Sequence, residues 1–418
     1  MKTLAVLVGG GPSPGINAVI AAATIEARNR GVRVVGCLEG FRPLVNRDPT
    51  QVRELDIDDV SRIHFDGGSI LRTARVNPAA SEESLRHVVE TLQQLEVSYL
   101  LTIGGDDTAS GAARVSQAFP GGLGVVHVPK TIDNDLPLPA DVPTFGFTTA
   151  VNVGKDIVRN LMADAAATGK WFLVNVMGRH AGHLAMGIGA GAGATLTVIG
   201  EELPAPPVSI HLPADIIEGA IIKRLADRRD HGVALVAEGI AEKLDLATLG
   251  EVERDPYGNV MLAEVDLARL LKARITASLR ARGLTTGIVP KNLGFELRCA
   301  PPGAFDIQYC RSLGYWGARL LLDGRTGVMA TIQAGRVVPV PFAELMDPDT
   351  GRIRVRYLDV ESEWYQTQYA YMIRLKPDDF AGPDRIRALA EAGRLSESDF
   401  VARFEYLVRE RKGFAWPA

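Results

Sequence analysis

Short apolar runs that alternate with helical patterns constrain the fold more than any other feature of this sequence. Five runs in the N-terminal half have the length of buried strands, at residues 4–8, 32–37, 99–103, 125–128 and 171–176. Helical patterns lie between them, the clearest over residues 16–29. Such an alternation predicts a parallel sheet flanked by helices.

Size and composition exclude several classes of protein. The chain has 418 residues, of which 46% are hydrophobic, enough for two domains or for two domains and an extension. A net charge of -4 argues against the broad basic surface that a nucleic-acid backbone requires. The apolar runs are too short, or too broken by glycine, for a signal peptide or a membrane span. The three cysteines lack metal-type spacing, so we expect reduced thiols and a cytosolic protein.

Most of the predicted strands end at glycine-rich or acidic turns. Ligands of open α/β sheets bind at the carboxyl ends of the strands, so we look for function in these turns. The first is residues 9–15, GGGPSPG, directly before the predicted helix. Glycines let backbone N–H groups approach an anion, and a helix N-terminus attracts it, which makes this turn a candidate phosphate cradle. A tight turn without a ligand is the alternative.

Two adjacent carboxylates follow the strand at residues 99–103, in the sequence Gly104-Gly105-Asp106-Asp107-Thr108. Two adjacent carboxylates repel each other unless a cation balances their negative charge, and Mg²⁺ with bound phosphate is the usual partner. A solvated turn with a helix-capping Asp is the alternative.

The next strand ends in a loop that carries several reactive groups. Residues 129–135, PKTIDND, place Lys130, Thr131, Asp133 and Asp135 on one short segment. Phosphoryl transfer to a hydroxyl needs a base for the proton and cations for the moving charge, and this loop supplies both. An acidic surface loop is the alternative.

Arginines after two later runs are candidates for binding a sugar phosphate. Met177-Gly178-Arg179-His180 follows the run at 171–176, and residues 293–298, LGFELR, end in Arg298. A guanidinium group binds phosphate through a planar fork, although each arginine alone is more often part of a surface ion pair. The run at 233–236, followed by Ala237-Glu238-Gly239, has the same form.

In this order, the segments resemble the phosphofructokinase family over about residues 3–324. The segments that carry the resemblance are residues 9–17, 67–75, 104–108, 129–135, 177–179 and 293–298. The resemblance implies an α/β fold of two Rossmann-like three-layer α/β/α domains, with parallel-rich sheets and the active site in the cleft between them. The part after about residue 330 matches only longer members of the pyrophosphate-using type.

The predicted domains follow from this resemblance. Residues 1–144 with about 300–345 form the domain for the phosphoryl donor and Mg²⁺, residues 145–299 form the sugar-phosphate domain, and residues 346–418 are a C-terminal extension. We expect a closing helix over residues 384–412. We expect the aromatic residues of the extension to cover apolar surface or to form an oligomer interface; they include Trp364, Tyr365, Tyr369 and Tyr371.

The resemblance also implies roles for individual residues. Asp106 would hold Mg²⁺, Asp133 would be the general base, and Arg298 would hold the 6-phosphate of fructose 6-phosphate. The remaining donor-site residues would be Gly10, Gly11, Arg75, Gly105 and Thr108. The remaining sugar-phosphate residues would be Thr131, Ile132, Asp135, Met177, Gly178, Arg179, His180, Glu238, Lys291 and Phe295, with Arg179 also taking part in catalysis.

Two positions select the phosphoryl donor in this resemblance. ATP-using members resemble this sequence but have glycine where Asp107 and Lys130 stand. A carboxylate at the first position occupies the space of a nucleotide's α-phosphate, and the ammonium of Lys130 binds pyrophosphate. We therefore predict reversible transfer of a phosphoryl group from pyrophosphate to the 1-hydroxyl of fructose 6-phosphate.

Several alternatives remain open. They are an ATP-dependent 6-phosphofructokinase, a pyrophosphate-dependent kinase that also accepts sedoheptulose 7-phosphate, a lipid or nucleotide kinase, and a subunit that has lost the chemistry. The presence of both Asp106 and Asp133 argues against the last of these.

Some positions depart from the family pattern. Pro12 replaces an Asp in the first loop, and Phe295 replaces a His. Lys291 and Lys170 stand at or near positions where a neighbouring subunit contributes arginines, so we expect a homodimer or a homotetramer. Ala21 and Ile25 replace effector-binding arginines, and we expect no regulation by nucleotide diphosphates or phosphoenolpyruvate.

Overall fold

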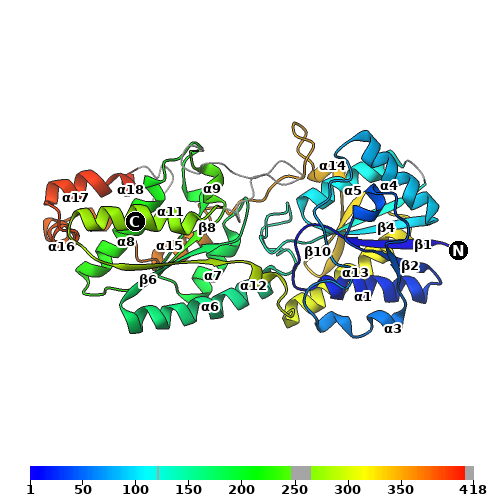
Figure 1. Ribbon diagram of the computed structural model, residues 1–418, viewed down its shortest axis with the longest axis horizontal. Helices are drawn as coiled ribbons and strands as arrows, with labels where there is room; N and C mark the ends of the chain where they lie inside the picture. Colours follow the sequence, from blue (N-terminus) through cyan, green and yellow to red (C-terminus); the bar gives the residue numbers. More distant parts are fainter. Residues whose placement is uncertain (120–121, 246–264, 410–418) are drawn as a thin grey trace. The chain divides into compact units, whose positions relative to one another are not determined.

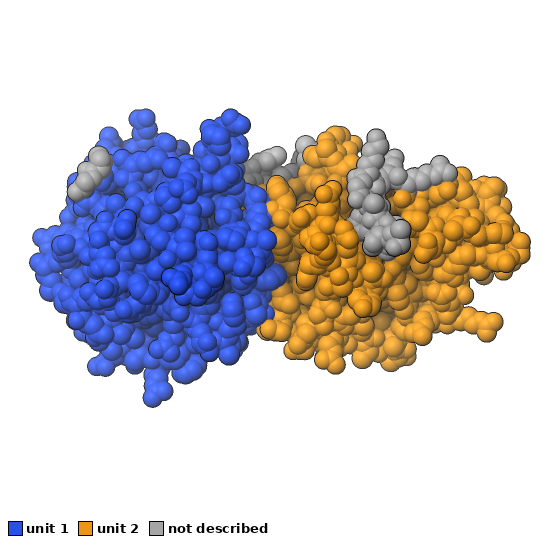
Figure 2. All heavy atoms as spheres, turned by 180° about the vertical axis from the view of Figure 1, so that it is seen from behind, with its two compact units in different colours: residues 1–150, 254–259, 295–356 blue, residues 151–253, 260–294, 357–418 orange. Residues whose placement is uncertain are grey.

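The computed structural model describes residues 1–119, 122–245 and 265–409. These residues form two compact units, which Figure 2 colours separately. Unit 1 comprises residues 1–150 and 295–356, and unit 2 comprises the described residues of 151–294 and 357–409. The segment 346–418, set apart above as one extension, is therefore divided at residue 356 between the two units.

Unit 1 is built on a seven-stranded sheet within the described residues, in the order β11-β10-β5-β4-β1-β2-β3. Its strands are β1 (Thr3–Val8), β2 (Arg33–Cys37), β3 (Val52–Glu54), β4 (Val97–Gly104), β5 (Gly124–Pro129), β10 (Val328–Gln333) and β11 (Arg336–Pro341). The strands from β10 to β2 pair in parallel, whereas β3 and β11 pair antiparallel at the two edges. The predicted parallel sheet is confirmed.

Helices cover both faces of this sheet (Figure 1). The helices of unit 1 among the described residues are α1 (Ile16–Asn29), α2 (Arg42–Val45), α3 (Ile57–Val60), α4 (Glu82–Gln94), α5 (Asp106–Ala118), α12 (Phe295–Arg298), α13 (Ala304–Leu322) and α14 (Phe342–Leu345), with a 3-10 turn at Ile63–Phe65. Leu4, Val6 and Val8 of β1 pack with α1 and α13. Ala5 and Leu7 face the other way and pack with α4 and α5. Burial on both faces explains the uninterrupted apolar run.

Unit 2 contains a four-stranded parallel sheet in the order β7-β8-β6-β9 among the residues described. Its strands are β6 (Lys170–Val176), β7 (Leu196–Val198), β8 (Gly232–Ala237) and β9 (Gly287–Leu293). The helices that accompany the sheet are α6 (Phe147–Thr168), α7 (His183–Ala192), α8 (His211–Ala226), α9 (Ile240–Lys243) and α11 (Leu267–Ala281), with a 3-10 turn at Gly200–Glu202. Figure 1 shows α6 and α7 on one face of the sheet, and α8 and α11 on the other.

The end of the chain differs from the prediction. The prediction of a single helix over residues 384–412 is wrong within the described residues, because three short helices take its place. Residues 410–412 lie outside the described residues. These are α16 (Pro383–Gly393), α17 (Glu397–Phe404) and α18 (Tyr406–Arg409). Arg394 ends α16 in a left-handed conformation (φ 50°), and the hydroxyl of Ser396 caps α17 by accepting from the N–H of Asp399 at 3.1 Å. Phe400 and Phe404 then pack against Ile222 of α8.

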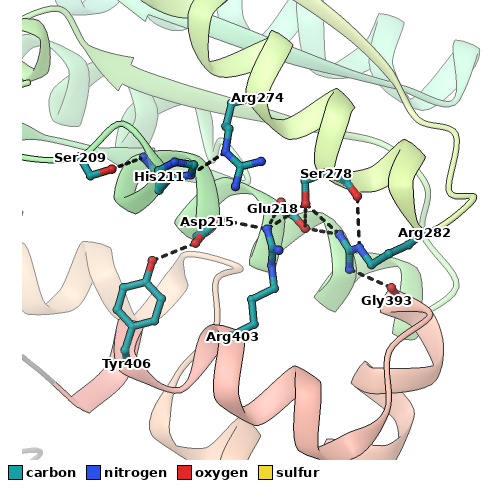
Figure 3. A network of polar contacts seen from close by, with 10 residues as sticks. All are labelled: Ser209, His211, Asp215, Glu218, Arg274, Ser278, Arg282, Gly393, Arg403 and Tyr406. Carbon is teal, nitrogen blue, oxygen red and sulfur yellow. Dashed lines mark hydrogen bonds and ion pairs between the residues drawn. The ribbon is translucent and has the colours of Figure 1, made fainter. Parts of the chain in front are cut away.

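A buried ion-pair network joins these C-terminal helices to α8 and α11 (Figure 3). The carboxylate of Glu218 accepts hydrogen bonds from Arg282, from Arg403 at 3.1 Å and from Ser278 at 2.9 Å. Arg403 also pairs with Asp215 at 3.3 Å. Burial raises the pKa of Glu218, and the two arginines oppose that shift. We call Asp215, Glu218, Arg282 and Arg403 the α8–α17 network.

Helix α15 (Glu363–Tyr371) presents its aromatic residues to two environments. Tyr365 and Tyr369 are buried, and the guanidinium of Arg374 lies 5.0 Å from the Tyr369 ring centroid. Arg374 also pairs with Glu202 at 2.6 Å. Trp364 and Tyr371 are exposed. The chain continues through a 3-10 turn at Pro377–Phe380.

None of the described helices has the length and apolar character needed to cross a membrane.

Candidate active site

The glycine turn after β1 is held between two neighbouring segments of unit 1. The N–H of Gly9 donates to the carbonyl of Ile103 at 2.9 Å, and the N–H of Gly10 donates to Ala74 at 3.1 Å. Thr73 returns a hydrogen bond to the carbonyl of Gly10 at 2.5 Å. Gly10 has a φ of 79°, which glycine adopts without strain. This pairing fixes the segment that leads to Arg75 beside the turn.

The second turn, Gly104 to Thr108, packs directly against the first. A Cβ atom at Gly9 or at Gly104 would collide with the Thr108 side chain, so both positions require glycine. Gly105 caps α5 in an extended conformation, and Asp106 and Asp107 form its first turn. Carboxylates there interact favourably with the positive end of the helix dipole. The predicted pair of carboxylates therefore lies at a helix N-terminus at the carboxyl edge of the sheet.

Lys130 lies at the centre of this group of residues. Its backbone N–H donates to Gly104 at 2.7 Å, and its buried ammonium donates to the carbonyl of Gly11 at 2.5 Å. Burial lowers the pKa of Lys130 to about 8. The positive charges of Arg298 and Arg75 also lower it, while Asp133 and Asp106 oppose the shift. These four charged side chains are therefore the electrostatic neighbours of one ammonium group.

The buried side chain of His127 supports the turn that begins at Gly104. The two ring nitrogens of His127 lie 2.8 Å from the hydroxyl of Thr102 and 3.0 Å from the carbonyl of Gly104. Only Nε2 can donate to that carbonyl, so the ring carries its proton on Nε2 and accepts from Thr102 through Nδ1. Burial lowers the pKa of His127 to about 3, despite the hydrogen bond to Gly104, so the ring is neutral near neutral pH.

The loop after β5 is braced internally. The N–H of Asp133 donates to the hydroxyl of Thr131 at 3.0 Å. Thr144 donates its own hydroxyl to the carbonyl of Thr131 at 2.6 Å and its N–H to the side chain of Asn134 at 2.9 Å. Asn134 is buried in a left-handed conformation (φ 59°), and Ile132 is also buried. The loop thus holds Asp133 in a defined place.

Arg298 lies beside the first glycine turn of unit 1. A Cβ atom built on Gly11 would be 3.3 Å from the guanidinium carbon of Arg298. The same guanidinium lies 5.2 Å from the ring centroid of Phe295, which is exposed. Above, Arg298 was assigned to a domain of residues 145–299, whereas the structure groups residues 295–356 with the N-terminal unit.

Unit 2 carries only part of the predicted sugar-phosphate residues, after β6 and β8 and within β9. Gly178 has a φ of 146°, and its N–H donates to the Glu238 carboxylate at 3.3 Å. Gly239 approaches the backbone of Arg179 so closely that a Cβ would collide with it. His180 lies 2.9 Å from Glu242. Met177 donates its N–H to Leu293 at 2.9 Å.

The lysines at the expected subunit contacts lie on neighbouring strands of the unit 2 sheet. Lys170 pairs with Gly287, and Lys291 pairs with Val174, four residues further along both strands. Paired positions four residues apart share one face of a sheet. Lys170 is exposed and Lys291 is half-buried.

The predicted site residues thus fall into two groups. Unit 1 holds Gly10, Gly11, Arg75, Gly105, Asp106, Asp107, Thr108, Lys130, Thr131, Ile132, Asp133, Asp135, Phe295 and Arg298. Unit 2 holds Met177, Gly178, Arg179, His180, Glu238 and Lys291.

The few side chains that could bind a metal ion in this site suit a metal that is bound mainly through phosphate. Among the described residues, no group of three or more His, Cys, Asp or Glu side chains could hold a metal ion by itself. Mg²⁺ in phosphate sites typically takes one or two protein carboxylates and completes its coordination with phosphate oxygens and water. Asp106, half-buried beside the charge of Lys130, fits that requirement.

Three residues that support this site were not predicted from the sequence. His127 lies within a predicted apolar strand, three residues before Lys130, and a lone polar residue in such a run was the available signal. Thr73 lies inside the segment 67–75, where only Arg75 was singled out. Thr144 follows a run of prolines and has no local signal.

Glycine turns, clustered cations and paired carboxylates at the carboxyl edge of a parallel sheet define an α/β protein of the phosphate-binding class. Comparison with known proteins agrees with this class. The family model for phosphofructokinase matches residues 3–321. The chain therefore belongs to the phosphofructokinase family.

Two relatives are similar over nearly the whole chain. A pyrophosphate–fructose 6-phosphate 1-phosphotransferase of Naegleria fowleri is 49% identical, over 98% of this chain and 96% of that protein. One with the same name from Thermotoga maritima is 48% identical, over 96% of this chain and 98% of that protein. A crystal structure of a pyrophosphate-dependent phosphofructokinase from Nitrosospira multiformis shares the fold, with a TM-score of 0.67 and 18% identity over 92% of this chain and 96% of that one.

Proposed function

We propose that this chain catalyses the reversible transfer of a phosphoryl group from inorganic pyrophosphate to the 1-hydroxyl of fructose 6-phosphate. The products are fructose 1,6-bisphosphate and phosphate. The buried ammonium of Lys130, hydrogen-bonded to Gly11 and close to both Asp106 and Asp133, is the observation that carries this proposal. The names of the two relatives with 48% and 49% identity agree with it.

The choice of donor rests on size and charge. Lys130 occupies buried space beside the first glycine turn, and Asp107 adds a carboxylate to the first turn of α5. In this proposal, the two side chains limit the donor to two linked phosphates and oppose the additional phosphate of a nucleotide triphosphate. The ammonium also binds pyrophosphate as a compact point charge.

The chemistry needs one base and several cations. Asp133 accepts the proton of the 1-hydroxyl, the oxygen of that hydroxyl bonds to the terminal phosphorus of pyrophosphate, and the bond to the bridging oxygen breaks to release phosphate. Lys130 and Arg75 stabilise the negative charge on the transferred group.

Mg²⁺ is the metal that we propose for this site, with Asp106 as its protein ligand and Gly10, Gly11, Gly105 and Thr108 shaping the surroundings of the phosphates. When bound, it neutralises charge on the phosphate oxygens. In the reverse direction, Asp133 returns its proton to the oxygen that leaves phosphorus.

The proposal also assigns roles to the residues predicted to bind the sugar phosphate. Arg298 holds the 6-phosphate, and its place beside Gly11 also makes it a candidate to contact the transferred phosphoryl group. Arg179 contacts the sugar phosphate, and Glu238 accepts from the sugar hydroxyls. The other residues proposed to line this site are Thr131, Ile132, Asp135, Met177, Gly178, His180, Lys291 and Phe295.

The proposal includes a cytosolic location and a homodimer or homotetramer in which Lys170 and Lys291 reach a partner's site. Cys37, Cys299 and Cys310 are free thiols, which suits a reducing compartment. We also propose that the enzyme has no allosteric site for nucleotide diphosphates or phosphoenolpyruvate.

A donor panel tests the proposal. Purified protein is assayed with fructose 6-phosphate and Mg²⁺, with pyrophosphate or ATP as donor, and fructose 1,6-bisphosphate is measured. We expect activity with pyrophosphate to exceed that with ATP, and the opposite order would overturn the assignment. The double variant Asp107→Gly, Lys130→Gly should gain activity with ATP, and no gain at all would contradict the steric account of donor choice.

A further inference from the structure

We propose that Arg356 is a positioning residue for the reaction, because its side chain holds the loop that carries Asp133. The inference rests on the proposed function, in which Asp133 is the base. Arg356 lies beyond residues 3–321, the part of the chain that the family model matches.

Arg356 binds one continuous stretch of this loop through its backbone and its guanidinium group. Its backbone N–H donates to the carbonyl of Asp135 at 2.7 Å. Its Nε and Nη2 donate to the carbonyl of Asn134 at 3.0 and 2.9 Å, and Nη2 also contacts the Asn134 side chain. Its Nη1 donates to the carbonyls of Leu138 at 3.1 Å, Pro139 at 2.8 Å and Val142 at 2.9 Å.

The loop lacks some of the N–H donors that could bind its carbonyl groups from within. Pro137, Pro139 and Pro143 lack an N–H group, so they cannot take part in a regular hydrogen-bond ladder. Buried backbone carbonyls nevertheless require partners. A guanidinium group carries five N–H donors in one plane, and here it satisfies carbonyls from both ends of the loop at once.

Asn134 connects this contact to the base. It follows Asp133 directly, is buried, and has a left-handed backbone conformation (φ 59°). Arg356 donates to the backbone carbonyl of Asn134, and the side-chain oxygen of Asn134 accepts a hydrogen bond from the N–H of Thr144 at 2.9 Å. The backbone next to Asp133 is therefore fixed from two directions, and loss of either contact allows Asp133 to shift.

The segment that carries Arg356 is itself anchored on α5, the helix whose first turn contains Asp106. Ile353 is buried in the same core as α5, and its N–H donates to the Ser110 hydroxyl at 3.3 Å. Arg354 donates its backbone N–H to Leu345 at 3.0 Å. Through these contacts the segment 345–356 joins the helix that bears the metal carboxylate to the loop that bears the base. A shift of Asp133 relative to Asp106 would misplace the acceptor hydroxyl, and small misplacements cost large factors in rate.

The test compares Arg356→Met, Arg356→Lys and wild type. The first variant keeps an apolar stem without donors, and the second keeps the charge but has one ammonium group that cannot reach both ends of the loop. We expect kcat to fall roughly 10- to 100-fold in both variants, with KM for both substrates changing less than about threefold. Arg354→Met is the matched control, because the side chain of Arg354 contacts the carbonyl of Glu344 in α14 and not the loop of Asp133; its kcat should stay within about twofold of wild type.

Amide hydrogen exchange gives a second readout that does not depend on activity. Amides of residues 133–144 should exchange at least about tenfold faster in the Arg356 variants, while amides of β1 and β4 keep their protection. A normal kcat per folded molecule in Arg356→Met would overturn the inference, whatever the loop exchange shows. Unchanged loop exchange in that variant would also overturn it. Should Arg356→Met not fold, Arg356→Lys decides by the same criteria. Wild-type protein without activity on pyrophosphate would refute the proposed function instead, and loop exchange would still decide whether Arg356 holds the loop.

Discussion

The ammonium of Lys130 donates a hydrogen bond to the carbonyl oxygen of Gly11, with 2.5 Å between Nζ and the oxygen. The two residues come from the ends of β5 and β1, which are separated by β4 in the sheet. The contact therefore joins the first glycine turn to the loop of Asp133. It also holds a titratable cation in a buried place.

The titration of Lys130 should limit activity at alkaline pH. Its pKa is lowered to about 8, chiefly by burial, so the ammonium is charged below pH 8 and loses its charge above it. We expect kcat/KM for pyrophosphate to fall about tenfold for each pH unit above pH 8. The value of kcat at saturating pyrophosphate should fall less, because the bound anion favours the charged form.

Steady-state rates between pH 6.5 and 9.5 check this expectation. Pyrophosphate itself titrates in this range, so Lys130→Arg is the control, since its side chain stays charged throughout. The variant should be slower at every pH but should lack the decline that belongs to Lys130. An identical alkaline decline in both proteins would assign it to the substrate.

Removal of the proposed base should lower turnover and spare binding. Asp133→Ala and Asp133→Asn should each reduce kcat by roughly two to four orders of magnitude, since the 1-hydroxyl loses its proton acceptor. The brace between Thr131 and Thr144 does not use the Asp133 side chain, so the loop should keep its shape. Calorimetric titration with fructose 6-phosphate should give a dissociation constant close to that of wild type. Near-normal turnover in Asp133→Ala would remove Asp133 from this role.

His127 should make the protein less stable in acid. Its pKa is about 3 in the folded state against 6.5 for an ordinary histidine, because burial disfavours the charged ring. The unfolded chain therefore binds one more proton between these values. The stability that the neutral ring contributes is complete above pH 6.5 and is lost as the pH falls towards 3, by about 1.4 kcal/mol per pH unit.

Urea denaturation at pH 7 and pH 5 measures that loss. His127→Gln can keep the donor to Gly104 but does not titrate, so its free energy of unfolding should change less between the two pH values. His127→Phe should instead be destabilised at both pH values, because the hydroxyl of Thr102 loses its buried partner. An equal pH dependence of wild type and His127→Gln would show that other groups cause the acid loss.

The α8–α17 network should stabilise the C-terminal helices. Arg403→Met leaves the buried carboxylates of Glu218 and Asp215 with fewer cations, at a cost of about 1–3 kcal/mol in unfolding free energy, less than for a fully buried pair because Arg403 is partly exposed. The Tm should fall by several degrees. Arg387→Met is the matched control, since Arg387 forms only exposed pairs among the described contacts. Equal Tm values for the two variants would show that the network adds nothing.

Local pattern was sufficient where structure depends on nearby residues. The predicted helix over residues 16–29 is the observed α1, and the apolar run at 4–8 lies within β1. A strand buried on both faces, or a helix with one apolar face, leaves its period in the sequence itself. The error over residues 384–412 had a local cause, because Gly393 and Ser396 are helix-ending and helix-starting signals that were not used.

The candidate site was predictable in the order of its motifs but not in its support. Glycine turns and carboxylates follow strands, so Asp106 and Lys130 could be placed at one edge of a sheet from the sequence alone. The division of residues between the two units could not be predicted from the sequence. Arg298 belongs to unit 1 because residues 295–356 pack with the N-terminal residues.

The amino-acid sequence by itself determined the alternation of strands and helices, the family, and the identity of the charged residues at the strand ends. Only the tertiary structure decided which distant groups hold those residues in place. Arg356 lies 222 positions from Asn134, whose carbonyl it binds. A contact of this kind depends on how separate elements pack, and it leaves no periodic trace near either residue, because one arginine with suitable donors is indistinguishable in sequence from any other.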